Sequence, residues 1–429
     1  MMRPRGLKAW LMESTPTAAM TAMMCVALAI RLVVVACAFR GIASPENHYG
    51  DFGAEMGWVA RSLVLGQGFS SPFYPQTGAT ALVPPLFPFV LAAVFKLFGL
   101  YTAKAAIAML TIQSVCSALT CVPVYMTLRE AAGERQARLG GWLWAVYPFA
   151  INYAAAEVWD YALTSLLFAW CFYWAQRLPR EKRLLPWAGF GVLYGVAALS
   201  NPSVLSMLPF LLLLILWQRW RAGNAWLGRA LLTTAAVAMV LMPWTLRNER
   251  ALHQHIPMRD GFWLEFYAGN HGDISTSNPP DAHPATNAVE MQAFIHEGET
   301  GYLNRMHVQS IGYVKAHPVW FAGVSLRRFF RFWTGVWSFM PWYMRTQPLD
   351  IPNFFFCTAV TVLMVRGVRR WWKRDATAVM PYVIAIAVFP LPYYVTHASM
   401  DYRQPIEPIV IMLAAVGILG WVRKATTTS

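Results

Sequence analysis

Two carboxylates, Asp51 and Glu55, stand in a polar island that lies between long apolar segments, YGDFGAEMGWVARSLVLGQGFSSPFYPQTGATALVPPLFPF (residues 49–89). A helical pattern from about Ala54 to Leu65 follows, and a spacing of four residues places the two acids on one face. A carboxylate shielded by aromatic side chains at a membrane surface could act as a general base toward a hydroxyl or an amine. The structural interpretation makes Asp51 a helix cap and Glu55 a first-turn acid. That interpretation explains one acid better than the pair, so we favour a catalytic role for one of them.

Further acids and two prolines could border the same site. Glu157 and Asp160 flank Trp159 at the predicted outer end of an apolar helix, where a solvated cap and a functional role are equally compatible with the sequence. Pro84 and Pro85 suit the first turn of a helix. They would aim the apolar helix that follows back over the acidic face and so help to form a cleft.

Two arginines also stand out by position. Arg403 precedes the last apolar segment in HASMDYRQPIEP, where its guanidinium could bind the phosphate of a lipid head group in a bidentate manner or serve as an interfacial anchor. His397, Tyr402 and Glu407 could support it. Arg31 falls near the middle of the first apolar segment, where a charge costs at least about 2.5 kcal/mol, so we expect it to face a buried partner.

The composition predicts the elements that must position these residues. The 429 residues are 57% hydrophobic and only 13% charged, whereas a soluble domain averages about 25% charged residues. We therefore expect an all-α, polytopic membrane bundle with about ten crossing helices. The expected segments are 17–39, 105–128, 141–156, 161–175, 184–199, 204–217, 230–246, 351–365, 376–395 and 405–422.

The positions of the basic residues predict the orientation of the bundle. Lys and Arg cluster in alternate connections, which the positive-inside rule assigns to the cytoplasm together with both termini. The net charge of +14 therefore reflects the cytoplasmic connections of a membrane protein rather than a surface that binds nucleic acid. If the apolar stretch 84–98 crossed the membrane, the basic connections that follow it would move to the outer side. We therefore place this stretch, and by the same reasoning 320–342, along the outer face. We therefore expect one transmembrane domain (1–429) with two large outward regions, 40–102 and 247–348. We also expect it to lie in the inner (plasma) membrane.

Metal and disulfide chemistry find little support in the sequence. All six cysteines lie in apolar segments, and the HQH sequence at 253–255 has no accompanying metal motif. No metal ligands are predicted, although the use of a divalent metal stays open, and no other cofactor is indicated.

The acidic first loop, the ARSLVLGQGF sequence at 60–69, the PPLFPFVLAAVFKLFG sequence at 84–99 and the late arginine together resemble the GT-C superfamily of polytopic glycosyltransferases. The resemblance is to the branch that contains protein O-mannosyltransferases and the lipid A aminoarabinose transferase. It implies that a first-loop carboxylate is the catalytic base and that a basic residue holds a polyprenyl-phosphate leaving group. Carried over, the base would be Glu55 or Asp51, the phosphate contact Arg403, and the second acidic position Glu157 or Asp160.

The implied reaction is the transfer of a hexose-type sugar from a polyprenyl-phosphate donor to a glycan, lipid or protein acceptor at the outer face, with inversion. Relatives often carry a DExxY arrangement before the helix, which FGAEMGWVARSL lacks. A transporter or flippase of lipid-linked sugars is the main alternative, although such folds often show internal repeats. A non-catalytic scaffold would not need paired acids.

Overall fold

The chain forms a helical bundle in the computed structural model, which describes residues 15–38, 52–73, 76–271, 283–335, 344–345 and 348–419. The described residues contain no β-strand, only an isolated bridge between Ser70 and Ala79. The all-α, polytopic membrane architecture predicted from the sequence is confirmed.

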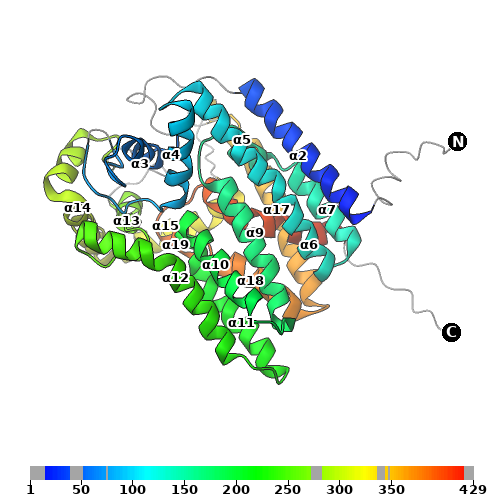
Figure 1. The fold of residues 1–429 in the computed structure, drawn as a ribbon. Coiled ribbons are helices and arrows are strands. Elements are labelled where there is room, and N and C mark those ends of the chain that lie inside the picture. Colours follow the sequence, from blue (N-terminus) through cyan, green and yellow to red (C-terminus); the bar gives the residue numbers. More distant parts are fainter. Residues whose placement is uncertain are drawn as a thin grey trace, which may run out of the picture.

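The α-helices follow one another along the whole described chain (Figure 1). They are α2 (Pro16–Ala38), α3 (Glu55–Val64), α4 (Leu86–Phe98), α5 (Ala103–Leu119), α6 (Cys121–Ala131), α7 (Glu134–Ala145), α8 (Pro148–Ala155), α9 (Tyr161–Arg177), α10 (Leu185–Ser200), α11 (Leu208–Arg221), α12 (Leu227–Leu252), α13 (Phe262–Gly269), α14 (Ala288–Ala316), α15 (Pro318–Thr334), α17 (Asp350–Trp372), α18 (Ala376–Val388), α19 (Leu391–Val395) and α20 (Glu407–Leu419). Short 3₁₀ turns, η1 (Leu178–Arg180), η2 (Pro202–Met207) and η4 (Asp401–Ile406), join some of them.

Seven helical stretches in the described part of the chain are long and apolar enough to cross a membrane. They are 16–37, 103–131, 202–221, 227–252, 350–372, 376–395 and 401–419. The other three expected segments form shorter helices, because Pro148 begins a new helix within 141–156 and because α9 and α10 contain only 17 and 16 residues. Helix α4, with 13 residues, spans only about 20 Å, less than the hydrocarbon thickness of about 30 Å.

Helix α20 lies at the centre of the bundle, where most of its side chains are buried. It packs closely against α17 because both helices carry a glycine at the contact: a Cβ on Gly367 would lie 2.0 Å from the carbonyl oxygen of Leu413, and one on Gly417 would lie 2.1 Å from that of Leu363. Such close approach of two backbones in a membrane bundle requires small residues at the interface.

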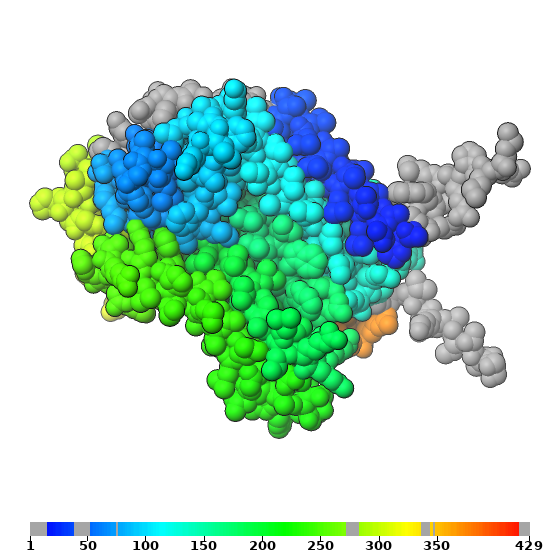
Figure 2. Space-filling model, in the orientation of Figure 1, coloured from blue at the N-terminus to red at the C-terminus, as the bar shows by residue number. Residues whose placement is uncertain are grey.

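Helix α2 lies along one side of the bundle (Figures 1 and 2) and contributes the buried Arg31. Its guanidinium donates hydrogen bonds to the Ser117 hydroxyl (3.0 Å) and to the carbonyl of Ala145 (2.9 Å). The buried partner expected from the sequence is thus a set of neutral oxygens rather than an acid.

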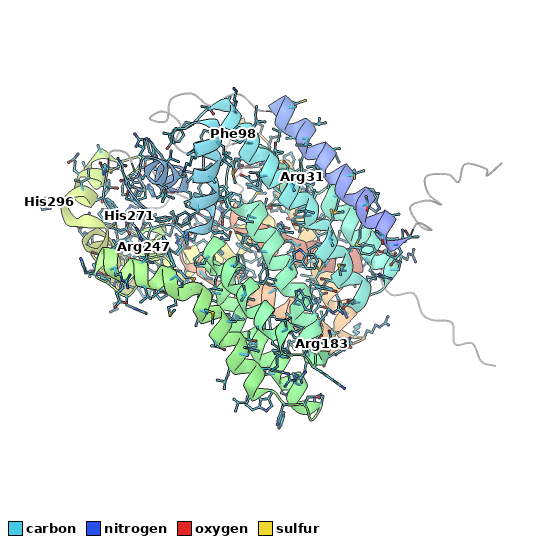
Figure 3. All side chains as sticks on the ribbon, viewed as in Figure 1. Arg31, Phe98, Arg183, Arg247, His271 and His296 are labelled. Carbon is cyan, nitrogen blue, oxygen red and sulfur yellow. The ribbon has the colours of Figure 1, made fainter. Side chains whose placement is uncertain are left out.

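Helices α3, α4, α13 and α14 gather at one end of the molecule (Figures 1 and 2). Figure 3 shows Arg247 and His296 at this end, and Arg183, from one of the predicted cytoplasmic basic clusters, at the other end of the long helices.

Asn287 begins α14 by accepting hydrogen bonds from the backbone N–H groups of Val289 and Glu290. Gly298, with φ of +70°, kinks that helix.

Candidate functional site

A cavity of about 370 Å³ lies between α3, the start of α9, α13 and the segment before α20. Four carboxylates line it, together with one arginine and two histidines: Glu55, Asp160, Glu265, Asp401, Arg259, His283 and His397. These residues come from five separate segments of the chain. The cavity is therefore a tertiary feature, and its charged lining is predominantly acidic.

The turn before α3 brings Glu55 to this cavity. Gly53 and Ala54 both adopt positive φ values, +78° and +51°, and a Cβ on Gly53 would lie 2.9 Å from the carbonyl oxygen of Val158. The turn consequently packs directly against the segment that contains Asp160. Glu55 is the first residue of α3, and its Oε1 lies 3.4 Å from Nε2 of His283. An acidic side chain in the first turn complements the dipole of the helix.

Asp51 lies outside the described residues. The cap position of α3 is occupied by Ala54, which offers no side-chain acceptor. Both interpretations of Asp51, as a helix cap and as a catalytic base, stay predictions.

Asp160 is buried in the cavity wall at the start of α9. Its Oδ2 accepts hydrogen bonds from the Thr164 hydroxyl (3.1 Å) and the Asn201 amide (3.4 Å) rather than from the backbone of the helix. Burial raises the pKa of its carboxyl to about 6, although these two hydrogen bonds oppose the shift. Glu157, the other predicted acid of this segment, does not line the cavity; its side chain is exposed and accepts a hydrogen bond from Asn152 (3.2 Å).

The opposite wall is built around Glu265 of α13. One of its oxygens lies 3.5 Å from a guanidinium nitrogen of Arg259, and the other lies 3.6 Å from Nε2 of His397. His397 also lies 2.5 Å from the Tyr402 hydroxyl. Glu265 thus connects the only arginine of the described lining with the segment before α20.

Asp401, in that last segment, accepts a hydrogen bond of 2.6 Å from the Tyr161 hydroxyl. Tyr161 stacks on Trp159 with ring centroids 5.6 Å apart, and both rings line the cavity. An acid and two aromatic faces therefore lie beside Asp160, which precedes Tyr161 in the chain.

Pro84 lines the cavity, and Pro85 caps α4 just behind it. The strand-like residues before them are held by the buried Glu299 of α14, whose carboxylate accepts hydrogen bonds from the Thr80 hydroxyl and from the backbone N–H of Ala81 (2.6 Å). Burial and the charge of nearby Asp260 raise the pKa of Glu299 well above its usual value.

Asp260 completes this connection, because its backbone N–H donates a hydrogen bond of 3.1 Å to the Ala81 carbonyl. The contact fixes the residue next to Arg259. Glu299 and Asp260 thus hold two walls of the cavity together without lining it.

Arg403 does not line the cavity. It is 2% exposed and forms an ion pair with Glu407, one turn later, while it also donates hydrogen bonds to the carbonyls of Phe332 (3.3 Å) and Trp333 (3.1 Å). The sequence suggested a group at the membrane surface, but the acid four residues later draws the guanidinium into the bundle. A contact between Arg403 and the donor phosphate stays a prediction, and the burial of the guanidinium does not favour it.

Sequence reasoning missed Arg259, Glu265, Asp401 and His283. Asp401 stands in the polar segment HASMDYRQP, two residues before Arg403. Only the arginine of this segment was predicted to bind a ligand. The other three lie among many polar residues of the 247–348 region, where no spacing distinguishes them. No group of three or more His, Cys, Asp or Glu residues in the described ranges is arranged to hold a metal ion.

Comparison with known families gives one match. The family model described as dolichyl-phosphate-mannose-protein mannosyltransferase matches residues 82–246. No curated protein sequence matches the chain.

Solved structures share the fold. The archaeal oligosaccharyltransferase AglB from Archaeoglobus fulgidus, in complex with an inhibitory peptide and a dolichol-phosphate, is 15% identical with a TM-score of 0.53, and the match covers 96% of this chain and 50% of AglB. The apo form of that enzyme gives 13% identity and a TM-score of 0.55, covering 96% and 51%. This chain therefore spans about half the length of that enzyme.

A structure of ArnT from Cupriavidus metallidurans bound to undecaprenyl phosphate is also similar, at 13% identity and a TM-score of 0.42, with 95% of this chain and 78% of ArnT covered. The family match and the fold shared with AglB confirm the predicted resemblance to the GT-C superfamily.

Proposed function

We propose that this chain is a glycosyltransferase that moves a sugar from a polyprenyl-phosphate donor to an acceptor at the outer face of the membrane. The observation that supports this most is that Glu55, Asp160 and Arg259 line one cavity although they are far apart in the sequence. A family model named for a dolichyl-phosphate-mannose enzyme and the dolichol-phosphate in the AglB complex support a lipid-phosphate donor.

Glu55 is the proposed base. Its carboxylate accepts the proton of the acceptor hydroxyl or amine while that atom attacks the anomeric carbon of the sugar. The new bond forms on the face opposite the phosphate, and the bond from the anomeric carbon to the phosphate oxygen breaks. A single displacement of this kind inverts the anomeric configuration. His283, 3.4 Å from Glu55, orients the carboxylate.

Arg259 is the proposed contact of the leaving phosphate. It is the one arginine of the described cavity lining, and its side chain is 32% exposed, so it can reach a ligand in the cavity. A guanidinium stabilises the charge that develops on the phosphate oxygens as the bond breaks. Asp160 takes the second acidic position in this proposal, where it holds Asn201 at the cavity wall.

Transfer in proteoliposomes tests the proposal. The full chain is supplied with polyprenyl phosphates that carry radiolabelled hexoses and with membrane extract as the source of acceptor. We expect Glu55→Gln to lower transfer about 100-fold or more, and Arg259→Gln to lower it about 10- to 1000-fold.

Glu249→Gln is the matched control, because Glu249 is an exposed acid of α12 that does not line the cavity. It should transfer at the wild-type rate. Full activity of the Glu55 variant would refute the proposed base. Movement of the lipid-linked sugar across the bilayer without any transfer would instead support the transporter alternative.

A further inference from the structure

A second, smaller cavity lies between α3 and the loop that follows it. Its volume is about 190 Å³. Gly66 and Gly68, both with φ of +75°, turn the chain back after the helix, and the bridge between Ser70 and Ala79 closes the loop. The described residues that line the cavity are Trp58, Arg61, Ser62, Gln67, Ser71, Phe73 and Gln76.

This cavity adjoins the main one along the same helix. Trp58 and Ser62 follow Glu55 by three and seven positions, which places them on the same side of α3, with Ser62 about 10 Å further along the axis. Phe73 lines the second cavity and contacts the His283 ring edge-on, with ring centroids 5.4 Å apart. His283 in turn contacts Glu55. The contact between the Phe73 and His283 rings therefore joins the linings of the two cavities.

The lining of the second cavity is suited to an anionic, hydroxyl-rich ligand. Arg61 is its only charged residue among those described, and a guanidinium binds a carboxylate or phosphate in a bidentate manner. Ser62 is 1% exposed, and its hydroxyl has no hydrogen-bond partner within the described part of the chain. Buried hydroxyls are usually paired, so the Ser62 hydroxyl retains hydrogen-bonding capacity beside the cavity.

The remaining polar groups extend the same chemistry. The amides of Gln67 and Gln76 can donate to or accept from sugar hydroxyls. Trp58 offers an aromatic ring beside the Arg61 guanidinium, whose carbon lies 5.7 Å from the ring centroid. No acid among the described lining residues would repel an anion.

We propose that this second cavity binds an anionic sugar residue of the acceptor, adjacent to the residue whose hydroxyl reaches Glu55. Naming the ligand an acceptor rests on the proposed function, whereas the preference for an anionic sugar rests on the cavity alone. Arg61 binds the acidic group, and Ser62, Gln67 and Gln76 bind the hydroxyls. The site would thus select acceptors by charge without taking part in the chemical step.

Direct binding tests the preference. The purified full chain in nanodiscs is titrated with methyl glucuronide, glucose 6-phosphate and the neutral methyl glucoside, and binding is followed by saturation-transfer NMR. We expect at least one anionic sugar to bind more tightly than methyl glucoside. Arg61→Gln should weaken the binding of that sugar roughly 10- to 100-fold, and comparison of the two anions shows whether the acidic group is a carboxylate or a phosphate.

Ser62→Ala is a second variant that retains the helix, and it should weaken both anionic and neutral binding by a few-fold. Arg135→Gln, an exposed arginine on α7, is the control and should change nothing. Equal binding of charged and neutral sugars, or binding that Arg61→Gln leaves unchanged, would overturn the proposal.

Transfer kinetics separate this inference from the proposed function. With an anionic acceptor, Arg61→Gln should raise the acceptor KM at an unchanged kcat, whereas Glu55→Gln should lower kcat. If wild-type protein transfers nothing but binds anionic sugars through Arg61, the proposed function fails and the site stands. If transfer depends on Glu55 while Arg61→Gln leaves the acceptor KM unchanged, the site fails and the proposed function stands.

Discussion

The buried pair of Arg403 and Glu407 offers a direct choice between a structural and a phosphate-binding arginine. Arg403 is 2% exposed and Glu407 is 0% exposed, and the two side chains are ion-paired one turn apart. Removing one partner of such a pair leaves an uncompensated buried charge, which typically costs about 3–5 kcal/mol. Replacing both partners with apolar side chains of similar volume is often close to neutral.

We therefore expect Arg403→Met to lower the stability of the protein and the double replacement Arg403→Met with Glu407→Leu to restore most of it. The carbonyls of Phe332 and Trp333 lose a donor in both variants, so the double variant should remain within about 2 kcal/mol of wild type. For a chain of 429 residues, 1 kcal/mol corresponds to roughly 1 °C in Tm. The single variant should melt about 3–5 °C lower.

Tryptophan fluorescence in one detergent follows the melting, and sugar transfer is measured well below the lowest Tm. Arg366→Met, at an exposed position of α17, is the control and should neither melt earlier nor lose activity. A double variant that is stable and active supports the structural role. A double variant that melts like wild type but transfers no sugar would show that Arg403 contacts the donor and that the structural reasoning is wrong.

Four further predictions concern pH, packing and orientation. Burial raises the pKa of Asp160 to about 6, so transfer should fall as the pH drops through about 6, and Asp160→Asn should remove that limb of the rate profile. Burial raises the pKa of Glu299 above 4.5, so the folded protein retains a proton that the unfolded chain releases. Stability should therefore decrease as the pH rises above about 4.5, and Glu299→Gln should flatten this dependence. A Cβ on Gly367 would lie 2.0 Å from the Leu413 carbonyl oxygen, so Gly367→Val should lower Tm, whereas Gly189→Val, which meets open space, should not. A cysteine at the exposed His296 should react with a membrane-impermeant maleimide in intact cells beyond the level of unsubstituted protein, and labelling only after lysis would overturn the predicted orientation.

The sequence predicted the local elements of the fold well, because these depend on short-range patterns. The helix expected from Ala54 to Leu65 is α3, Glu55–Val64. Hydropathy cannot distinguish a long crossing helix from a shorter buried one of the same composition. Helices α9 and α10 were therefore expected as crossings, although they are shorter than the seven spanning stretches.

The site was only partly predictable, because the cavity joins segments that lie far apart in the chain. Glu55, Asp160 and Pro84 do line it, in agreement with their placement near one cleft. Arg259 and Glu265 could not be singled out, since Glu265 contacts His397, more than a hundred residues later, and Arg259 contacts Glu265. The burial of Arg403 had a local signal, because Glu407 stands four residues later on the same helical face.

The surroundings of the acids decide which of them can act as the base. A general base must be ionised and must reach the acceptor. Asp160 is 4% exposed, and one of its oxygens already accepts two hydrogen bonds, so little of it is open to a substrate. Asp401 is hydrogen-bonded to the Tyr161 hydroxyl, and Glu265 lies between Arg259 and His397. Glu55 is the first residue of α3, it lines the cavity, and its side chain is 15% exposed. The same division of roles explains how one arginine can serve a site with four acids, since Asp160 and Asp401 are held by hydrogen bonds from the Thr164 and Tyr161 hydroxyls.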